Sequence, residues 1–504
     1  MNENLSELKT RLAEISDLRA ASSLAHWDQA TYMPSGGAEA RGRQISTLNR
    51  LAHEKFIEPR VGELLESLRE LERSTPFEDD TASLIRVTRR EWEKAVRVPA
   101  EFEAKMSDHF AQIYQAWTIA RPENDFASVA PLLEKTLDLS RELASFFPHQ
   151  NKNGHIADPL IDFSDEGMTV GVLRPLFAEL KSQLVPLVEA IAQKPETDGS
   201  CLRRKYLKDE QIAFANTLAT HIGYDWNRGR NDMTHHPFMS KFSLGDVRIT
   251  NRAQENDISD ALFGTLHETG HALYEQGIDL SFESTPLANG TSSGVHESQS
   301  RLWENLVGRS RGFWEIFFPQ IQAAFPEQLK MVSLDDWVRA INKVERSLVR
   351  TDADEVTYNL HVMIRFELEV QMLEGALAIK DLPDAWRAMY REYLGIEPHD
   401  DSSGVLQDVH WFAGTIGGAF QGYTLGNILS AQFYNCALQS NPQIEMDLRK
   451  GEYSSLLGWL RENIYQHGAK FTAPELIERV TGGPLSIAPY MKYLNAKYSA
   501  LYDL

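Results

Sequence analysis

The stretch "GTLHETGHALYEQG", residues 264–277, places two histidines four positions apart around a glutamate. Its apolar residues recur at helical spacing, which predicts an amphipathic helix. An α-helix has about 3.6 residues per turn, so His267 and His271 project from the same face, one turn apart. Two imidazoles in this arrangement can hold one metal ion between them, and Glu268 lies next to that face.

The ligand types indicate the chemistry of such a site. Imidazole nitrogen suits zinc, and two histidines leave a tetrahedral ion short of one protein ligand and one open position for water. Glu268 is placed to accept a proton from that water and to return it to a leaving amine, which is amide-bond hydrolysis. The same pattern arises by chance in about one chain of this length in twenty-five, and the histidines would then be ordinary buried helix residues.

A third ligand is available in "GVHESQSRLWENLVG", residues 294–308, which is a second helical pattern. Glu297 lies near its start, and side-by-side packing of the two helices would bring its carboxylate to the ion. An acid in a first helical turn is also common because it interacts favourably with the helix dipole. Glu304 is the rival ligand, and the spacing leaves both open.

Composition narrows the class of protein. The chain of 504 residues has 72 Asp and Glu against 51 Lys and Arg, a formal charge of −21, so its field repels phosphate backbones and nucleic acid is not an expected partner. Cys201 and Cys436 cannot build a disulfide framework, and the start of the chain has no continuous apolar region typical of a signal peptide. We therefore expect a cytoplasmic protein.

The periodicity predicts a mainly α-helical fold. Helical patterns occur from residue 5 to 18 and near residues 80, 131, 171 and 453, and no long linker separates them. Residues 1–504 therefore read as a single catalytic domain. The exception is "DVRITNR", residues 246–252, whose alternation predicts a strand, so we expect a small β-sheet beside the metal helix.

One segment is long enough to span a bilayer, because residues 411–444 contain no Asp, Glu, Lys or Arg. It carries several Gln and Asn side chains, however, and is broken by glycines, which is too polar for lipid. We expect a buried wall beside a cavity and no membrane partner.

Six short motifs then occur in order along the chain. They are "HPF" (236–238), "DVRIT" (246–250), "HETGH" (267–271), "HESQ" (296–299), "VRTDAD" (349–354) and "GVLQDVHW" (404–411). Together they resemble the signature of the carboxypeptidase Taq family of metallocarboxypeptidases, and the likeness covers essentially the whole chain. The resemblance implies a saddle-like helical subunit with a deep active-site groove, a homodimer, and removal of C-terminal residues from peptides with broad specificity.

Carried onto this chain, the resemblance makes His267, His271 and Glu297 the ligands of one divalent ion, with Glu268 as general base. It favours Glu297 over Glu304. Zinc is the expected ion, and a nitrogen and oxygen ligand set also accepts cobalt or manganese. The chain departs from many relatives at Val349, where they have isoleucine, and in residues 412–422, where they have a phenylalanine and proline before the tyrosine.

A carboxypeptidase also has to bind a free terminal carboxylate, which a planar guanidinium does with two parallel hydrogen bonds. Arg350 is favoured over Arg248, because Asp246 lies two residues from Arg248 and can engage it in a structural ion pair. Either arginine could equally form an ordinary salt bridge.

The tetrahedral intermediate needs hydrogen-bond donors for its oxyanion, and His236, His410 and Tyr423 are the available types. His410 and Asp408 could instead orient other groups.

Two other functions fit parts of the pattern. The first is an oligopeptidase that cuts internal bonds with the same zinc chemistry, and a groove closed at one end would exclude it. The second is an inactive peptide-binding scaffold, which would have no reason to keep Glu268 between both histidines.

Overall fold

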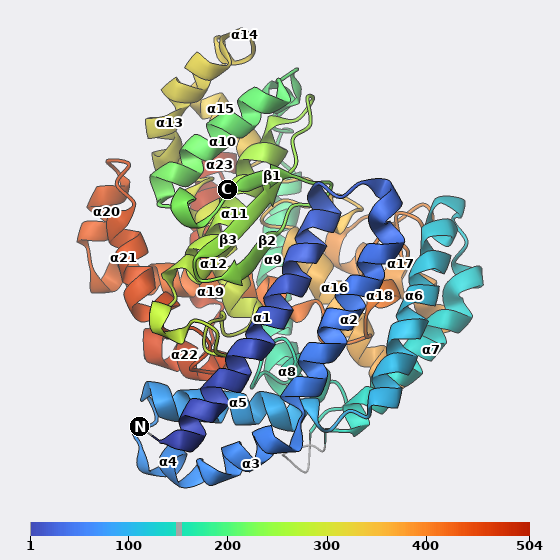
Figure 1. The fold of residues 1–504 in the computed structure, drawn as a ribbon. Helices are drawn as coiled ribbons and strands as arrows, with labels where there is room; N and C mark the ends of the chain where they lie inside the picture. Colours follow the sequence, from blue (N-terminus) through green and yellow to red (C-terminus); the bar gives the residue numbers. More distant parts are fainter. Residues whose placement is uncertain (1, 148–153) are drawn as a thin grey trace.

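The computed structural model describes residues 2–147 and 154–504 and shows a helical protein with one small sheet (Figure 1). The predicted mainly α fold is therefore confirmed. The helices of the first half are α1 (Glu3–Thr31), α2 (Ala38–Phe56), α3 (Pro59–Ser67), α4 (Arg69–Ser74), α5 (Asp80–Ala95), α6 (Ala100–Glu123), α7 (Phe126–Ser145), α8 (Asp158–Asp162), α9 (Val170–Ala192) and α10 (Lys208–Ile222).

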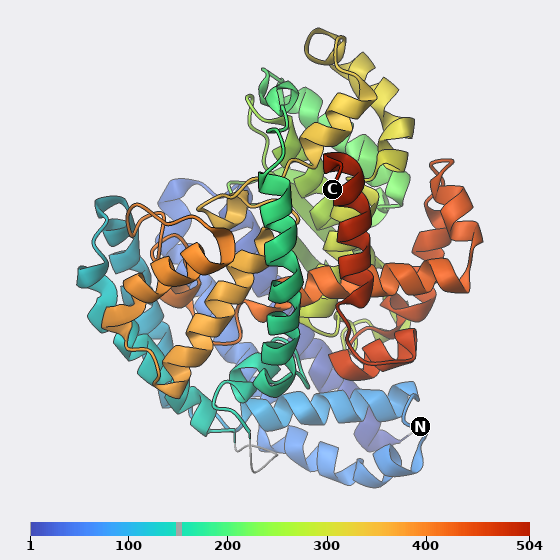
Figure 2. The ribbon, with the colours of Figure 1, turned by 180° about the vertical axis from the view of Figure 1, so that it is seen from behind.

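The second half of the chain carries the two helices of the predicted metal site, α11 (Ile258–Gly277) and α12 (Ser293–Arg301), and Figure 2 shows this half from behind. The other helices of this half are α13 (Arg311–Ala324), α14 (Pro326–Leu329), α15 (Leu334–Ile341), α16 (Tyr358–Glu374), α17 (Leu382–Leu394), α18 (His410–Ala413), α19 (Gln421–Ser440), α20 (Gln443–Leu448), α21 (Ser454–Asn463), α22 (Ala473–Thr481) and α23 (Ala488–Tyr502). Each segment predicted as helical from its periodicity overlaps one of these helices, although α12 and α21 end before the predicted segments do.

The N-terminal helices have a hydrophobic core of their own. Leu8, Leu12 and Ile15 follow the helical spacing read from the sequence, and all three are buried. They pack with apolar residues of α2, α3 and α5 and with the chain that follows α11. The predicted first helix is thus an amphipathic helix that buries one stripe against its neighbours.

The small sheet lies beside α11, as predicted. Its strands are β1 (Asn231–Met233), β2 (Met239–Ser243) and β3 (Asp246–Asn251), in the order β1-β3-β2. β3 pairs parallel with β1 and antiparallel with β2. Val247 and Ile249 are fully buried and pack with Ala272 of α11, so alternation along β3 directs one face onto the metal helix.

Close helix packing brings the second motif to α11. A Cβ added to Gly270 would lie 2.5 Å from the carbonyl oxygen of Gln299, so only glycine lets α12 approach this closely. α12 then continues as a π-helix over Leu302–Val307. π-Helical turns widen a helix locally and are frequent at functional sites.

The uncharged segment forms the wall that we expected. Most of the N-terminal part of α19 is buried, and the helix packs along α12. A Cβ on Gly426 would lie 2.3 Å from Cγ of Glu297, which shows how near this wall stands to the metal motif. Within residues 2–147 and 154–504, no helix combines the length and apolar character needed to cross a lipid bilayer.

Candidate metal centre

Three side chains converge between α11 and α12. Oε2 of Glu297 lies 3.6 Å from Nε2 of His267 and 3.4 Å from Nε2 of His271. Zinc bonds of about 2.0–2.1 Å at tetrahedral angles separate neighbouring ligand atoms by about 3.3 Å, which is close to both distances, and all three atoms lie within 4.8 Å of one another. The two imidazoles keep 19% and 16% of their surface exposed, which leaves a side open to solvent.

The other nitrogen of each imidazole already has a partner. Nδ1 of His267 lies 2.8 Å from Oε2 of Glu304, and Nδ1 of His271 lies 2.6 Å from Nδ1 of His296. Such contacts fix the ring orientation, so Nε2 of both histidines is directed to the shared centre. His296 in turn contacts Oε1 of Glu275 at 2.9 Å. The donor set therefore fits a divalent ion.

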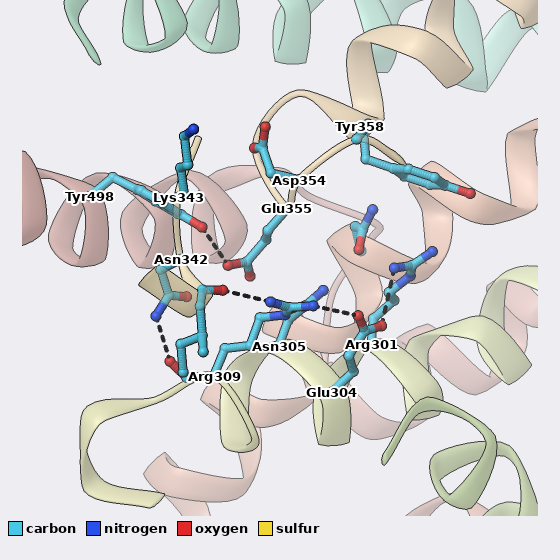
Figure 3. A pocket seen from close by; sticks show the side chains of 13 residues that line it. Arg301, Glu304, Asn305, Arg309, Asn342, Lys343, Asp354, Glu355, Tyr358 and Tyr498 are labelled. Carbon is cyan, nitrogen blue, oxygen red and sulfur yellow. Dashed lines mark hydrogen bonds and ion pairs between the residues drawn. The ribbon is translucent and has the colours of Figure 1, made fainter. Parts of the chain in front are cut away.

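Glu304 is consequently a partner of a histidine, and Arg301 lies between the two acids. Arg301 Nε donates to Oε1 of Glu297 at 2.7 Å, and Nη1 donates to Oε2 of Glu304 at 3.2 Å. Burial alone would raise the pKa of both carboxyl groups. Arg301 and His267 instead lower the pKa of Glu297 well below its ordinary range and the pKa of Glu304 to about 2. A polar cavity of about 60 Å³ is lined in part by Arg301 and Glu304 (Figure 3).

Glu268 differs from these acids. It is 7% exposed, and burial raises the pKa of its carboxyl group to about 7, with the negative charges of Glu297 and Glu304 adding to the shift. A carboxylate in this range can both accept and return a proton near neutral pH. It follows His267 directly in α11 and so lies next to the ligand cluster.

Arg350 is held by a specific network. It lies at the start of a short 3₁₀ turn (Arg350–Asp352), is 7% exposed, and uses Nε and Nη2 to bind the carboxylate of Asp408, with Nη2 to Oδ1 at 2.7 Å. Nη1 donates to the hydroxyl of Tyr358 at 2.9 Å. Asp408 also forms an ion pair with Arg365. Three of the five N–H groups of a guanidinium are thereby engaged, leaving one on each terminal nitrogen.

Arg248 forms the ion pair with Asp246 that its neighbourhood suggested. Nε and Nη2 lie 2.8 and 2.7 Å from the two carboxylate oxygens, and the guanidinium stacks over Trp27 and Phe242. Since Arg350 is also paired, a partner alone does not distinguish the two candidates. They differ in their surroundings, because Arg350 and Arg301, the arginine bound to Glu297, both contact the ring of Tyr358.

The three predicted oxyanion donors lie around Arg350. Nε2 of His410 is 3.2 Å from the hydroxyl of Tyr423, and Arg350 lies over the ring of Tyr423. His236 is exposed in the loop between β1 and β2, and desolvation by its neighbours lowers its pKa, as do the positive charges of Arg252 and Arg350. The structure therefore gathers residues that are far apart in the sequence.

Sequence reasoning missed the support around the ligands. Arg301 comes four residues after Glu297, and Glu304 comes three residues after Arg301. This spacing places all three on one helix face and could have identified them as a group. Lys241 binds Glu275 at 2.7 Å behind His296, and no local pattern links it to the site. The same is true of Tyr358.

Comparisons with known proteins agree with this geometry. The family model of carboxypeptidase Taq (M32) metallopeptidases matches residues 7–498. The chain is 42% identical to thermostable carboxypeptidase 1 of Thermus thermophilus, covering 99% of this chain and 98% of that one, and 37% identical to carboxypeptidase 1 of Bacillus subtilis, covering 98% and 97%. The crystal structure of the M32 carboxypeptidase from Deinococcus radiodurans superposes with a TM-score of 0.96 at 50% identity over all of both chains. The chain therefore belongs to the carboxypeptidase Taq (M32) family of metallopeptidases.

Proposed function

We propose that this metallocarboxypeptidase releases the C-terminal residue of peptides by metal-assisted hydrolysis, with Glu268 as general base. The observation that carries the proposal is the convergence of Nε2 of His267, Nε2 of His271 and Oε2 of Glu297 beside a buried glutamate. A divalent ion held by these atoms supplies a Lewis acid and lowers the pKa of a water molecule. Zinc suits the ligand set, and cobalt or manganese can substitute.

The protein's own groups then have separate tasks. Glu268 accepts the proton of the attacking water and returns it to the leaving amine. Arg350 binds the terminal carboxylate through its two remaining N–H groups, and its buried position strengthens this interaction. His410, Tyr423 and His236 supply hydrogen bonds to the oxyanion. Arg248 closes one side of the substrate path through its stack with aromatic side chains.

Replacing Glu268 distinguishes the role of general base from that of metal ligand. Glu268→Gln should retain the metal and lose activity by several orders of magnitude, because its carboxylate handles a proton and does not hold the ion. His271→Ala and Glu297→Ala should lose the metal as well. Bound metal and turnover are measured on the same preparations. Metal loss in Glu268→Gln, or normal metal affinity in Glu297→Ala, contradicts the assignment.

The carboxylate anchor is tested with one peptide, free and amidated at its C-terminus. A charge-assisted contact of about 1.5–3 kcal/mol corresponds to a preference of roughly tenfold to a hundredfold in kcat/KM for the free acid. Arg350→Ala should abolish that preference, and Arg350→Lys should be impaired because it loses the planar fork. An unchanged ratio in Arg350→Ala would move the anchor to Arg248, and equal cleavage of both peptides by the parent would indicate an oligopeptidase.

We further propose that residues 1–504 act as one catalytic domain in a cytoplasmic homodimer. The family match across residues 7–498 supports one domain, and the two unpaired cysteines fit a reducing compartment. Light scattering of the purified protein gives the mass of the assembly and decides between monomer and dimer.

A further inference from the structure

We propose that Tyr358 is a positioning residue that fixes the separation between Arg350 and the metal ligands, and thereby restricts cleavage to the last peptide bond. This inference rests on the proposed role of Arg350 as the carboxylate anchor. Tyr358 is the first residue of α16 and is 8% exposed.

The side chain of Tyr358 connects the two halves of the site. Its hydroxyl accepts a hydrogen bond from Nη1 of Arg350 at 2.9 Å, and the guanidinium of Arg301 lies 4.6 Å from its ring centroid. Figure 3 shows Tyr358 and Arg301 lining the same cavity. Since Arg301 binds Glu297 at 2.7 Å, one aromatic ring separates the carboxylate anchor from the arginine behind a metal ligand.

The ring is itself held firmly. The backbone N–H of Tyr358 donates to the carbonyl oxygen of Asp354 at 2.9 Å, which ties it to the turn that carries Arg350. The ring of Tyr423 packs against it edge-on, with the centroids 6.2 Å apart. The ring gains cation–π attraction from Arg301 and its hydroxyl is bonded to Arg350, so displacing it loses several contacts at once.

A fixed separation matters because of the dimensions of a peptide. One extended residue spans about 3.3–3.6 Å. If the anchor moved away from the metal ligands by this distance, the penultimate bond would lie at the reacting position and a dipeptide would be released. Asp408 holds Arg350 from one side, and Tyr358 opposes its displacement relative to the metal ligands, because Arg350 is bonded to its hydroxyl and Arg301 is stacked on its face.

The experiment uses the metal-loaded full chain and one peptide, free and amidated. Tyr358→Phe removes the hydroxyl and should lower the free-to-amidated ratio of kcat/KM about three- to tenfold, mainly through a higher KM for the free acid. Tyr358→Leu removes the ring and should in addition release dipeptide. The matched control is Tyr490→Phe, which loses a buried hydroxyl bonded to Asn359 without contacting Arg350. It should keep the parent ratio.

The outcomes distinguish this inference from the proposed function. If the parent prefers the free acid and Arg350→Ala loses that preference, the anchor is correct, and unchanged ratios and products in both Tyr358 variants then overturn the role of Tyr358. If Arg350→Ala keeps the preference, the proposed anchor itself has failed. Metal content is measured throughout, and should Tyr358→Leu fail to fold, the ratio in Tyr358→Phe decides.

Discussion

The pKa values of buried glutamates in this protein shift up or down according to the groups that each carboxyl contacts. Glu268 and Glu369 lack a strong cationic partner, and burial raises the pKa of each to about 7. Glu275 and Glu304 are also buried, but each has cationic partners. Lys241 and His296 lower the pKa of Glu275 to about 2. Arg301 and His267 lower the pKa of Glu304 to about 2. Desolvation favours the neutral acid and a paired cation favours the carboxylate, so the partner decides the protonation state.

Glu369 gives a prediction about stability and pH. Its carboxyl accepts from Trp411 Nε1 at 2.8 Å and is 1% exposed. Because its folded pKa lies above the ordinary value, its contribution to stability is complete below about pH 4.5 and is lost as the pH rises through about 7. Glu369→Gln keeps an acceptor for Trp411 and should be more stable than the parent at pH 8 by roughly 1–3 kcal/mol.

Denaturant unfolding at pH 5 and pH 8 measures this difference. The advantage of Glu369→Gln should shrink at pH 5, where the parent carboxyl is neutral in the folded protein. An advantage that is equal at both pH values, or a loss at pH 8, contradicts the interpretation.

At the scale of elements, three packed helices set the position of the ligand carboxylate. α11 carries the histidines, α12 carries Glu297, and α19 presses against α12 from behind. Gly270 and Gly426 permit the two close approaches, since a Cβ at either would lie under 3 Å from atoms of α12. The helix contacts therefore determine where Oε2 of Glu297 lies relative to both imidazoles.

A methyl group at Gly426 tests this packing. Gly426→Ala should lose about 1–3 kcal/mol of stability through overpacking. It should also bind metal more weakly, because the added Cβ would lie 2.3 Å from Cγ of Glu297 and push that side chain out of position. The matched control is Gly458→Ala in α21, where an added Cβ meets nothing within 4 Å. That variant should be neutral or gain about 0.5–1 kcal/mol from helix propensity.

Thermal unfolding and metal titration of both variants provide the measurement. Normal metal affinity in Gly426→Ala would show that α19 does not control the position of Glu297.

At the scale of the molecule, the metal helix is embedded in the main hydrophobic core. Leu262, Leu266 and Leu273 of α11 are fully buried in a cluster that extends to α23. Small domains without such a core unfold when their metal is removed, whereas a large core keeps its helices without one. We therefore expect the fold to persist without the ion.

Metal removal provides the corresponding prediction. After exhaustive chelation the protein should be inactive but should keep its far-ultraviolet circular dichroism. A metal ion that binds the folded site and not the unfolded chain stabilises the fold, so added zinc should raise the melting temperature in a concentration-dependent way. The free energy of unfolding should rise by about 4 kcal/mol at a free concentration 1,000 times Kd. Full activity without metal, or unfolding on chelation, would contradict this view.

The sequence alone determined the features that depend on local geometry. Helical periodicity predicted the α-helices, alternation predicted β3, and the four-residue spacing of His267 and His271 placed both rings on one face. The pairing of Arg248 with Asp246 was also local, because the two residues are neighbours on one strand face. Periodicity fixes such relations before any tertiary contact forms.

Only the tertiary structure decided which acid faces the histidines. Glu297 and Glu304 share one helix face, so spacing could not separate them, whereas the packing of α12 on α11 puts Glu297 at Nε2 of both rings and Glu304 at Nδ1 of His267. Arg350 pairs with Asp408, which lies 58 residues further along the chain. Such pairings depend on how distant elements pack, and a sequence pattern of period 2 or 3.6 carries no information about that packing.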